Sequence, residues 1–479
     1  MPFTLPTVPT VAIIGGGFTG AAVAYHLARL TGEPLRIVVF EPRAEIGLGL
    51  AYSTQDPAHR INVPAARMSL RPGDEGHFVR WLAAHDALDG DPVATLANGQ
   101  SYPARRLFGR YVSEQLRPML ADGRIEHHRA RIASVANEAD RWALTCDTGE
   151  TLAADVIVIA TSHPPPAPPA ILSAAFEGER RFIADPWADG ALVSIARDDR
   201  VLVVGTGLTM ADVIATLDAR GHRGAITAIS RRGQRSHSHA PGYVEPFGDF
   251  ATQPSRTTLD LLRRVRAAVQ KGGPWQGLFD RLRVQAPQIW RALPLPERRR
   301  LIRHLRPFWD THRFRIAPQV GAVLDRWIAA GTLSIRAATI NDARMQGAQC
   351  AVTLKDRGKT TRTEIFDAVI ATTGPGHGNV LASQGFLATL VTSGLLVPDP
   401  TNLGVAVDDE GHMIGRDGPN PRAFVAGPLA RGTFGELMGL PEVTNHAVFV
   451  AKSVIAVIGS GLTDRSQKGT VPASASVEK

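Results

Sequence analysis

The sequence predicts an α/β protein in which two parallel β-sheets are each entered through a glycine-rich turn. Residues Val11 to Leu30 have the pattern of an apolar strand, a glycine turn and a small-residue helix, and the apolar strand RIVVFEP follows. The same pattern returns from Arg200 to Gly221 and continues into AITAISRRG. Between the two copies lies HPPPAPP, which starts at His163 and can continue neither a strand nor a helix.

The glycines of the first copy predict a nucleotide-binding turn. Gly15, Gly17 and Gly20 stand at GxGxxG spacing, which permits the turn, admits a pyrophosphate and packs the helix on the strand. Glu41 ends the next strand, where a carboxylate can bind ribose hydroxyls. We therefore expect a first Rossmann-like domain that binds FAD through these residues: Gly15, Gly17, Phe18, Thr19, Gly20 and Glu41.

The second copy differs from the first in two places. Ala211 stands where the first copy has its third glycine, and Arg231 and Arg232 follow the next strand in place of an acid. Guanidinium groups can bind a 2′-phosphate that a carboxylate would repel, although two solvated surface arginines are the alternative. We therefore expect a second Rossmann-like domain for NADPH, with NADH as the other option. Its expected contacts are Gly205, Gly207, Leu208, Thr209, Asp212, Ser230, Arg231 and Arg232.

These signals divide the chain into six parts. The expected parts are an FAD-binding domain at 1–165 and 366–463, an NAD(P)H-binding domain at 185–245 and 316–365, a basic helical insertion at 246–315 and a disordered tail at 464–479. Between Arg256 and Arg315 there are fifteen Lys and Arg against four Asp and Glu, so the rest of the chain carries a net charge of −3. We expect the insertion to cover the active site. Recruitment of an acidic substrate or of the pyridine nucleotide, and contact with nucleic acid or a membrane surface, are the alternatives.

Composition limits the remaining classes. The chain has two cysteines, Cys146 and Cys350, which form neither a CxxC pair nor a disulfide framework. The first ten residues lack the pattern of a signal peptide, and the sequence contains no apolar run of 18 residues. We expect a cytoplasmic protein with no metal site and with neither a nucleic acid nor a membrane partner. The oligomeric state stays open, with a homodimer as one option.

Two dinucleotide-binding domains in one chain indicate hydride transfer from nicotinamide to flavin. A dithiol acceptor would need a CxxC pair, which the sequence lacks. We therefore expect a single-component monooxygenase. In such an enzyme a flavin hydroperoxide transfers one atom of molecular oxygen to a small organic substrate, which can be a molecule that contains nitrogen. The alternatives are an FAD-dependent reductase or dehydrogenase that does not oxygenate, and a flavin-binding regulator or scaffold.

The segments GGGFTG, HRINVPAARMSL, SRRG with its histidine loop, and GPLARGTFGELMGLPE resemble a bacterial FAD/NAD(P)-binding family that includes a flavin-dependent urate hydroxylase. More distantly, the chain is similar to N-hydroxylating and flavin-containing monooxygenases. The likeness covers most of the chain and implies no particular substrate. It implies that Asn62 and Met68 lie beside the isoalloxazine ring and act in catalysis, with an ordinary Asn-Val-Pro turn as the alternative. It also implies cofactor contacts at Gly374, Gly427, Pro428 and Glu436.

Three further side chains are candidates. His237 and His239 follow the two arginines and could contact the pyridine nucleotide or the substrate, although loop histidines on the surface are the more common case. Their spacing does not match a metal site. Arg67, next to Met68, could bind an anionic substrate or take part in a structural ion pair.

Overall fold

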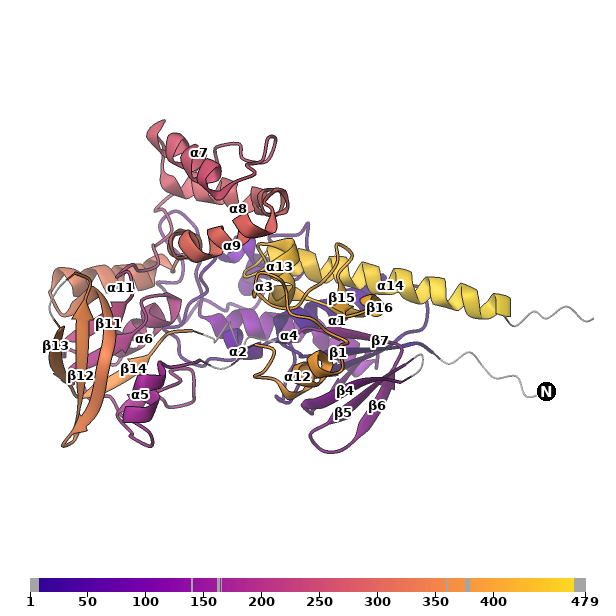
Figure 1. Cartoon of the computed structure of the whole chain (residues 1–479), viewed down its shortest axis with the longest axis horizontal. Helices are drawn as coiled ribbons and strands as arrows, with labels where there is room; N and C mark the ends of the chain where they lie inside the picture. The colour runs from indigo at the N-terminus through magenta and orange to yellow at the C-terminus, as the bar shows by residue number, and fades with distance from the viewer. Residues whose placement is uncertain are drawn as a thin grey trace, which may run out of the picture.

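The structure, a computed structural model, describes residues 8–138, 141–161, 164, 166–358, 361–374 and 380–468, and only the backbone of 461–468. Two sheet-based domains lie side by side, and a helical unit projects from the face above them (Figure 1). The predicted α/β class with parallel-sheet domains is confirmed.

The first sheet has six strands in the order β15, β16, β7, β1, β2, β3. Their bounds are His412–Gly415, Gly418–Val425, Val156–Ile159, Thr10–Ile14, Arg36–Phe40 and Ile125–His128. Every neighbouring pair is parallel except β15 and β16. All residues of β1 and β7 are buried, as expected for strands covered on both faces.

The second sheet has seven strands in the order β13, β12, β11, β10, β9, β14, β8. Their bounds are Thr361–Phe366, Gln349–Asp356, Leu333–Gln346, Ile226–Ser230, Val201–Val204, Ala368–Ala371 and Phe182–Ile183. The strands from β11 to β8 run parallel, whereas β11, β12 and β13 form an antiparallel extension.

Two expected domain boundaries fall inside this second sheet. β14 pairs with β9 and β8, so residues 368–371, expected in the FAD-binding domain, lie in the second domain. β8 precedes the expected start at residue 185. The apolar run of β14 shows that it is a buried strand, but only its pairing shows to which sheet it belongs.

A third sheet and most of the helices surround the first two. The antiparallel strands β4 (Ile132–Glu138), β5 (Arg141–Cys146) and β6 (Thr151–Ala154) form a small sheet on which α12 (Gly385–Thr392) packs. The remaining helices outside the insertion are α1 (Phe18–Leu30), α2 (Gly49–Tyr52), α3 (His77–Ala84), α4 (Arg105–Ala121), α5 (Ala170–Ala175), α6 (Leu208–Ala219), α11 (Pro318–Ala329), α13 (Arg431–Phe434) and α14 (Glu442–Lys468), with short 3-10 turns at η1 (Ala65–Arg67) and η3 (Gly427–Ala430).

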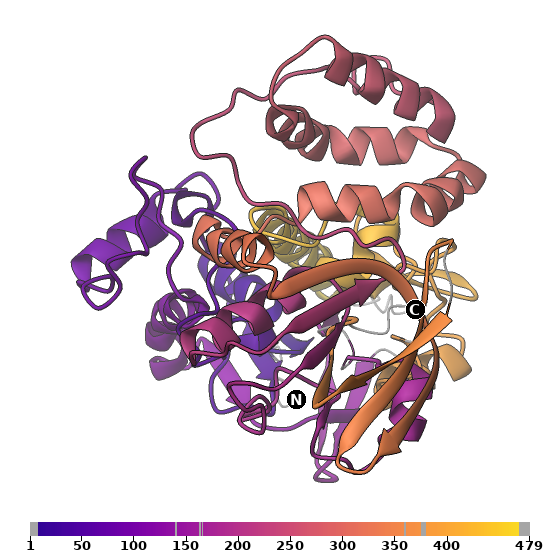
Figure 2. The ribbon, with the colours of Figure 1, turned by 90° about the vertical axis from the view of Figure 1, so that its left-hand side faces the viewer.

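The predicted helical insertion separates β10 from β11. Its helices are α7 (Thr258–Gln270), α8 (Trp275–Ala292), α9 (Leu295–His304) and α10 (Arg306–Arg313), and Figure 2 shows them as a separate layer over the two domains. Phe250, Leu261 and Leu278 belong to a small core of their own within this layer. Trp290 fastens the layer to the first domain, because its indole Nε1 donates to the carbonyl of Gly432 over 2.7 Å.

Helix α14 lies along α1 in the first domain. Its buried residues Val443, Ala447 and Val450 join the same core as α1. Within the described residues, the segment Glu442–Ser460 is the one helix that is long and apolar enough to cross a membrane. Of its apolar stretch of 18 residues, 39% is buried inside the protein. The helix continues to Lys468, past the expected start of a disordered tail at residue 464, and residues 469–479 lie outside the described residues.

Glycines let each turn pass close to a neighbouring strand. Gly15 has φ +100°, and a Cβ there would lie 2.8 Å from the carbonyl oxygen of Ala160 at the end of β7. Gly20 packs α1 onto the turn, since a Cβ at this position would lie 1.8 Å from the carbonyl oxygen of Gly15. In the second domain Gly205 has φ +120°, and its Cβ would lie 2.4 Å from the carbonyl oxygen of Thr372 after β14. Both turns therefore depend on glycine to reach the carboxyl edge of their sheets.

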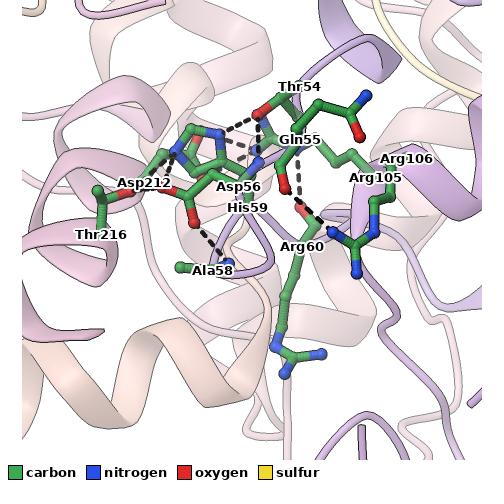
Figure 3. Close-up of polar contacts among 10 residues, drawn as sticks. All are labelled: Thr54, Gln55, Asp56, Ala58, His59, Arg60, Arg105, Arg106, Asp212 and Thr216. Carbon is green, nitrogen blue, oxygen red and sulfur yellow. Dashed lines mark hydrogen bonds and ion pairs between the residues drawn. The ribbon is translucent and has the colours of Figure 1, made fainter. Parts of the chain in front are cut away.

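A buried ion pair joins the two domains. Arg105, the first residue of α4, places Nη2 2.9 Å from Oδ2 of Asp212 in α6, and both residues are buried. Arg105 Nε also donates to the carbonyl of Arg60 over 2.8 Å. Burial raises the pKa of Asp212, and the Arg105 guanidinium opposes that rise. Figure 3 shows these side chains with the polar groups around them.

The contact at Gly20 predicts a large loss of stability on Gly20→Ala. The new methyl group would overlap a backbone oxygen that cannot move without opening the turn, so we expect a loss of at least the ~3 kcal/mol of severe overpacking. Chemical unfolding followed by circular dichroism measures the loss. Gly207→Ala is the control, because a Cβ there meets no atom within 4 Å; it should cost at most about 1 kcal/mol, the usual cost of Ala at a helix N-cap. Equal losses in the two variants would contradict this account.

The buried ion pair predicts non-additive effects at Arg105 and Asp212. Arg105→Met leaves a buried carboxylate without its cation, and we expect a loss of about 3–5 kcal/mol in the free energy of unfolding. Arg105→Met combined with Asp212→Asn should lose less than Arg105→Met alone, because no uncompensated charge remains. A double-mutant cycle from urea unfolding measures the coupling. Losses that simply add would show that the two groups do not interact.

Candidate active site

The first turn has the features of a site for a nucleotide pyrophosphate. Gly17 is the N-cap of α1, so the free amides of Phe18 and Thr19 begin the helix at the carboxyl edge of the first sheet. Glu41 is buried, and its Oε2 accepts a hydrogen bond from the Gly16 amide over 3.1 Å. The carboxylate expected to bind ribose is therefore held directly beside the turn.

The strand end at Gly427 closes the same region from the other side. A Cβ on Gly427 would lie 2.7 Å from the Cγ2 atom of Thr19, so the turn that contains Gly427 and Pro428 lies against the start of α1. The amide of Gly427 donates to Nδ1 of His446 over 3.1 Å. Because that nitrogen accepts, the proton of the neutral ring is on Nε2, and burial lowers the pKa of His446 to about 4.

The second turn is more open than the first. Gly207 caps α6, and no atom lies within 4 Å of the Cβ that it lacks. Leu208 and Thr209 form the first turn of the helix. Ser230 supports this turn, because its Oγ accepts hydrogen bonds from the Thr206 hydroxyl over 2.8 Å and from the Gly233 amide over 3.0 Å. The approach to the helix N-terminus is therefore free for a phosphate group.

The two arginines after β10 have different surroundings. Arg231 is exposed, whereas the guanidinium of Arg232 lies 4.8 Å from the ring centroid of Phe308 in α10 of the insertion. Neither residue makes a hydrogen bond or ion pair with any residue that the structure describes. Arg232 thus lies between the second domain and the insertion, and both guanidinium groups keep their donors available.

Two adjoining cavities lie between the domains. The smaller, about 230 Å³, is lined by Thr209, Thr372 and Gly374 of the second domain and by Leu50 and Arg105 of the first. The larger, about 420 Å³, shares Leu50, Pro186 and Trp187 with it. The smaller cavity lies at the crevice outside the carboxyl ends of β9 and β14, where ligands bind in open α/β sheets.

A polar cluster lines the larger cavity (Figure 3). His59 bonds Thr54 Oγ1 through Nδ1 over 2.8 Å and Thr216 Oγ1 through Nε2 over 3.1 Å. The Thr216 hydroxyl donates to Oδ2 of Asp56 over 2.7 Å. Burial lowers the pKa of His59 despite the nearby carboxylates of Asp212 and Asp56. This cluster connects α6 to the first domain through hydrogen bonds next to the Arg105 and Asp212 ion pair.

Asn62 and Met68 flank the short helix η1. Met68 is buried, and the carbonyl of Asn62 accepts a hydrogen bond from Nε2 of His239 over 2.8 Å. Burial lowers the pKa of His239 to about 4, so this histidine is neutral and supports the loop. The segment also reaches α14, since the Thr444 hydroxyl donates to the Ser69 carbonyl over 3.2 Å. The loop expected beside the isoalloxazine ring therefore lies against the start of α14.

Glu436 and His237 have partners in the insertion. Arg313 in α10 donates through Nη2 to Oε1 of Glu436 over 2.8 Å, and both side chains are buried. This carboxylate, expected to contact the cofactor, thus anchors α10 to the first domain. His237 lies 4.8 Å from His312 and 5.1 Å from Trp275, measured between ring centroids, so it joins an aromatic cluster with side chains of the insertion helices α10 and α8.

One group could hold a metal ion by geometry. Asp408, Glu410 and His412 bring ligand atoms within 4.8 Å of one another, and the described residues contain no other such group. Asp408 already accepts hydrogen bonds from the backbone of Glu410 and from Nδ1 of His412, at 3.0 and 2.9 Å. These contacts belong to the turn that precedes β15.

At the domain junction, the sequence patterns indicated Asp212, as a cofactor contact, but not Trp187, His59 or Arg105. Trp187 lies 5.2 Å from His59 and 5.4 Å from Arg105, as ring-centroid distances, and it lines both cavities. A single tryptophan in the polar segment DPWADG was the available signal. Arg105 and His59 stand in no motif, so only the tertiary arrangement identifies them.

Comparison with known proteins supports the assignment of the first domain. Residues 12–164 match the model of an FAD-NAD(P)-binding family. An uncharacterised protein of Mycobacterium tuberculosis is 25% identical over 95% of this chain and 97% of its own length. The uncharacterised protein YdhS of Escherichia coli is 23% identical over 57% of this chain and 53% of its own length.

Solved structures share the fold at low identity. An ornithine N-hydroxylase of Kutzneria, in complex with reduced FAD, NADP+ and L-ornithine, has a TM-score of 0.61 and 18% identity over 95% of this chain and all of its own. The FAD-bound cadaverine monooxygenase of Erwinia amylovora has a TM-score of 0.59 and 13% identity over 99% of this chain and all of its own. A thioredoxin reductase of Lactococcus lactis has a TM-score of 0.52 and 13% identity over 94% and 99% of the two chains.

The resemblance to a urate hydroxylase gains no support from these relatives and stays a prediction. The resemblance to N-hydroxylating monooxygenases is supported at the level of the fold. The chain therefore carries an FAD-NAD(P)-binding domain, as predicted, within a fold that it shares with N-hydroxylating monooxygenases.

Proposed function

We propose that this protein is a single-component monooxygenase that uses FAD and NADPH to insert one atom of molecular oxygen into a small organic substrate. The observation that carries the proposal is the pair of glycine turns, each at the carboxyl edge of its own sheet, with a shared cavity between the domains. The residues fit both cofactors. The first turn offers helix amides and the buried Glu41, and the second offers an open helix N-terminus with two free guanidinium groups.

When bound, FAD would accept hydride from NADPH and react with oxygen. The chain's own residues would position the two cofactors. The amides at the start of α1 and of α6 would hold the pyrophosphates, Arg231 and Arg232 would bind the 2′-phosphate, and Gly374 and Thr209 would line the path between the domains.

The positions of the two cysteines argue against a disulfide reductase. The fold is also shared with a thioredoxin reductase, so the fold alone does not select the acceptor. Cys146 lies in β5 of the small antiparallel sheet and Cys350 in β12 of the second sheet, both buried. Burial raises the pKa of both thiols, which makes them poor nucleophiles. No dithiol can therefore take electrons from a flavin in this chain.

The insertion supports an oxygenase rather than a simple reductase. Its helices cover the region of Gly432 and Glu436 through Trp290 and Arg313. A monooxygenase must exclude water from the reacting flavin, because water shortens the life of oxygenated intermediates. A covering layer fixed to the first domain by buried contacts would provide that exclusion.

Rapid mixing tests the proposal. The FAD-loaded protein is reduced anaerobically with NADPH and then mixed with oxygen while the flavin spectrum is recorded. We expect a transient species that differs from both oxidised and reduced flavin, together with incorporation of labelled oxygen into the product. Direct reoxidation without a transient, and anaerobic turnover with a quinone, would instead identify a reductase.

The free arginines after β10 predict the choice of cofactor. Arg231→Met combined with Arg232→Met should raise the KM for NADPH roughly 10-fold to 100-fold, the range expected for lost charge-assisted hydrogen bonds. The KM for NADH should change little, because NADH has no 2′-phosphate. Steady-state NAD(P)H oxidation measures both values. Arg223→Met, which removes an exposed arginine paired with Asp198, is the matched control; equal effects on NADPH and NADH in the double variant would contradict the assignment.

A further inference from the structure

One arginine near the predicted flavin loop has no partner. Arg67 ends η1, directly before Met68, and its side chain is exposed. Its guanidinium makes no hydrogen bond and no ion pair with any residue that the structure describes. The alternative of a structural ion pair is therefore not realised in the described part of the chain.

The charged groups around Arg67 are already matched to one another. Arg283 places Nε 2.6 Å from Oε1 of Glu442, and its Nη2 donates to the carbonyl of Leu440. Arg315 places Nη2 3.1 Å from Oδ1 of Asp280. Each of these acids therefore has its own arginine, and each of these arginines is buried.

Arg313 and Glu436 form a further pair beside this set, at 2.8 Å. The charged side chains near Arg67 thus form three pairs of one arginine and one acid each. Arg67 adds one positive charge that no acid in these pairs balances. Burial by the surrounding atoms and the nearby Arg283 lower the pKa of Arg67, and the carboxylates of Asp280 and Glu442 oppose that shift. A bound anion would offset the repulsion between Arg67 and Arg283.

The position of Arg67 points to a substrate rather than to a cofactor phosphate. The pyrophosphate sites lie at the first turns of α1 and α6. Arg67 instead lies two residues from Ser69, whose carbonyl is bound by Thr444 in α14, and it faces charged side chains of the insertion helix α8. This region lies between α14 and the insertion, apart from both helix N-termini that offer pyrophosphate sites.

We infer that Arg67 binds a carboxylate of the substrate, so that the proposed monooxygenase acts on small molecules that carry one such group. This inference rests on the proposed function. A guanidinium group binds a carboxylate through two parallel hydrogen bonds, and a single excess charge matches a single carboxylate. Polyanions would meet Asp280 and Glu442 on the same wall.

Matched ligands test the inference without turnover. L-lysine and cadaverine differ by one carboxylate, as do L-ornithine and putrescine, and benzoate and benzamide have similar shapes, but only benzoate is charged. Each is titrated into the oxidised FAD-loaded protein, and binding is followed by the change in the flavin spectrum and by calorimetry. We expect at least one carboxylate to bind about tenfold or more tightly than its uncharged or decarboxylated partner.

Variants assign the preference to Arg67. Arg67→Met should abolish it and Arg67→Lys should restore part of it, with unchanged melting temperature and FAD content. Arg303→Met is the matched control, because Arg303 is exposed on α9 and the change removes the same charge. The inference is wrong if no carboxylate in the panel is preferred, or if Arg67→Met keeps the preference.

The two proposals fail in different ways. Binding is measured on oxidised protein, so a carboxylate preference that depends on Arg67 supports this inference even in an enzyme that never uses oxygen. Conversely, oxygen insertion without any effect of Arg67→Met on carboxylate binding would keep the proposed function and overturn this inference.

Discussion

The whole arrangement depends on the close passage of a glycine turn across the end of a neighbouring strand, which occurs once in each domain. At Gly15 the turn passes the end of β7, and at Gly205 it passes the residue after β14. Any side chain would push the turn away from the sheet edge and with it the first amides of α1 or α6. The position of each helix start at its own sheet edge follows from these two contacts, and the buried Arg105 and Asp212 pair joins the two domains.

The two turns are similar in position but not in packing. In the first, Gly20 brings α1 against the carbonyl of Gly15, and Glu41 is held beside the turn, which suits a cofactor that stays bound. In the second, Ala211 takes the equivalent place and Gly207 has open space around it. A looser helix approach with exposed cations suits a nucleotide that binds and leaves. The asymmetry is therefore consistent with a resident FAD and an exchanging NADPH.

The sequence predicted what local patterns determine. The two strand, turn and helix units, the helical character of 256–315 and the return to sheet near 333 are confirmed, because glycine spacing and apolar periodicity are local signals. The domain to which β14 belongs was misjudged, since its apolar run is compatible with either sheet. At the polar junction, Asp212 was expected to contact the pyridine nucleotide, but it forms a buried ion pair with Arg105. His59 and Arg105 were missed because they come from distant segments and stand in no motif.

The basic insertion shows why a sum of charges can mislead. Its local excess of eleven positive charges was compatible with a nucleic acid partner. Many of these arginines instead bind the protein itself: Arg264 and Arg299 donate to backbone carbonyls, and Arg283 and Arg313 pair with acids of the first domain. Guanidinium groups that already bind carbonyls or carboxylates of the protein are not available to bind a polyanion. Arg67, whose guanidinium has no hydrogen-bond or ion-pair partner among the described residues, lies in the loop expected beside the flavin, so the insertion's charge acts by fixing the wall that this loop faces.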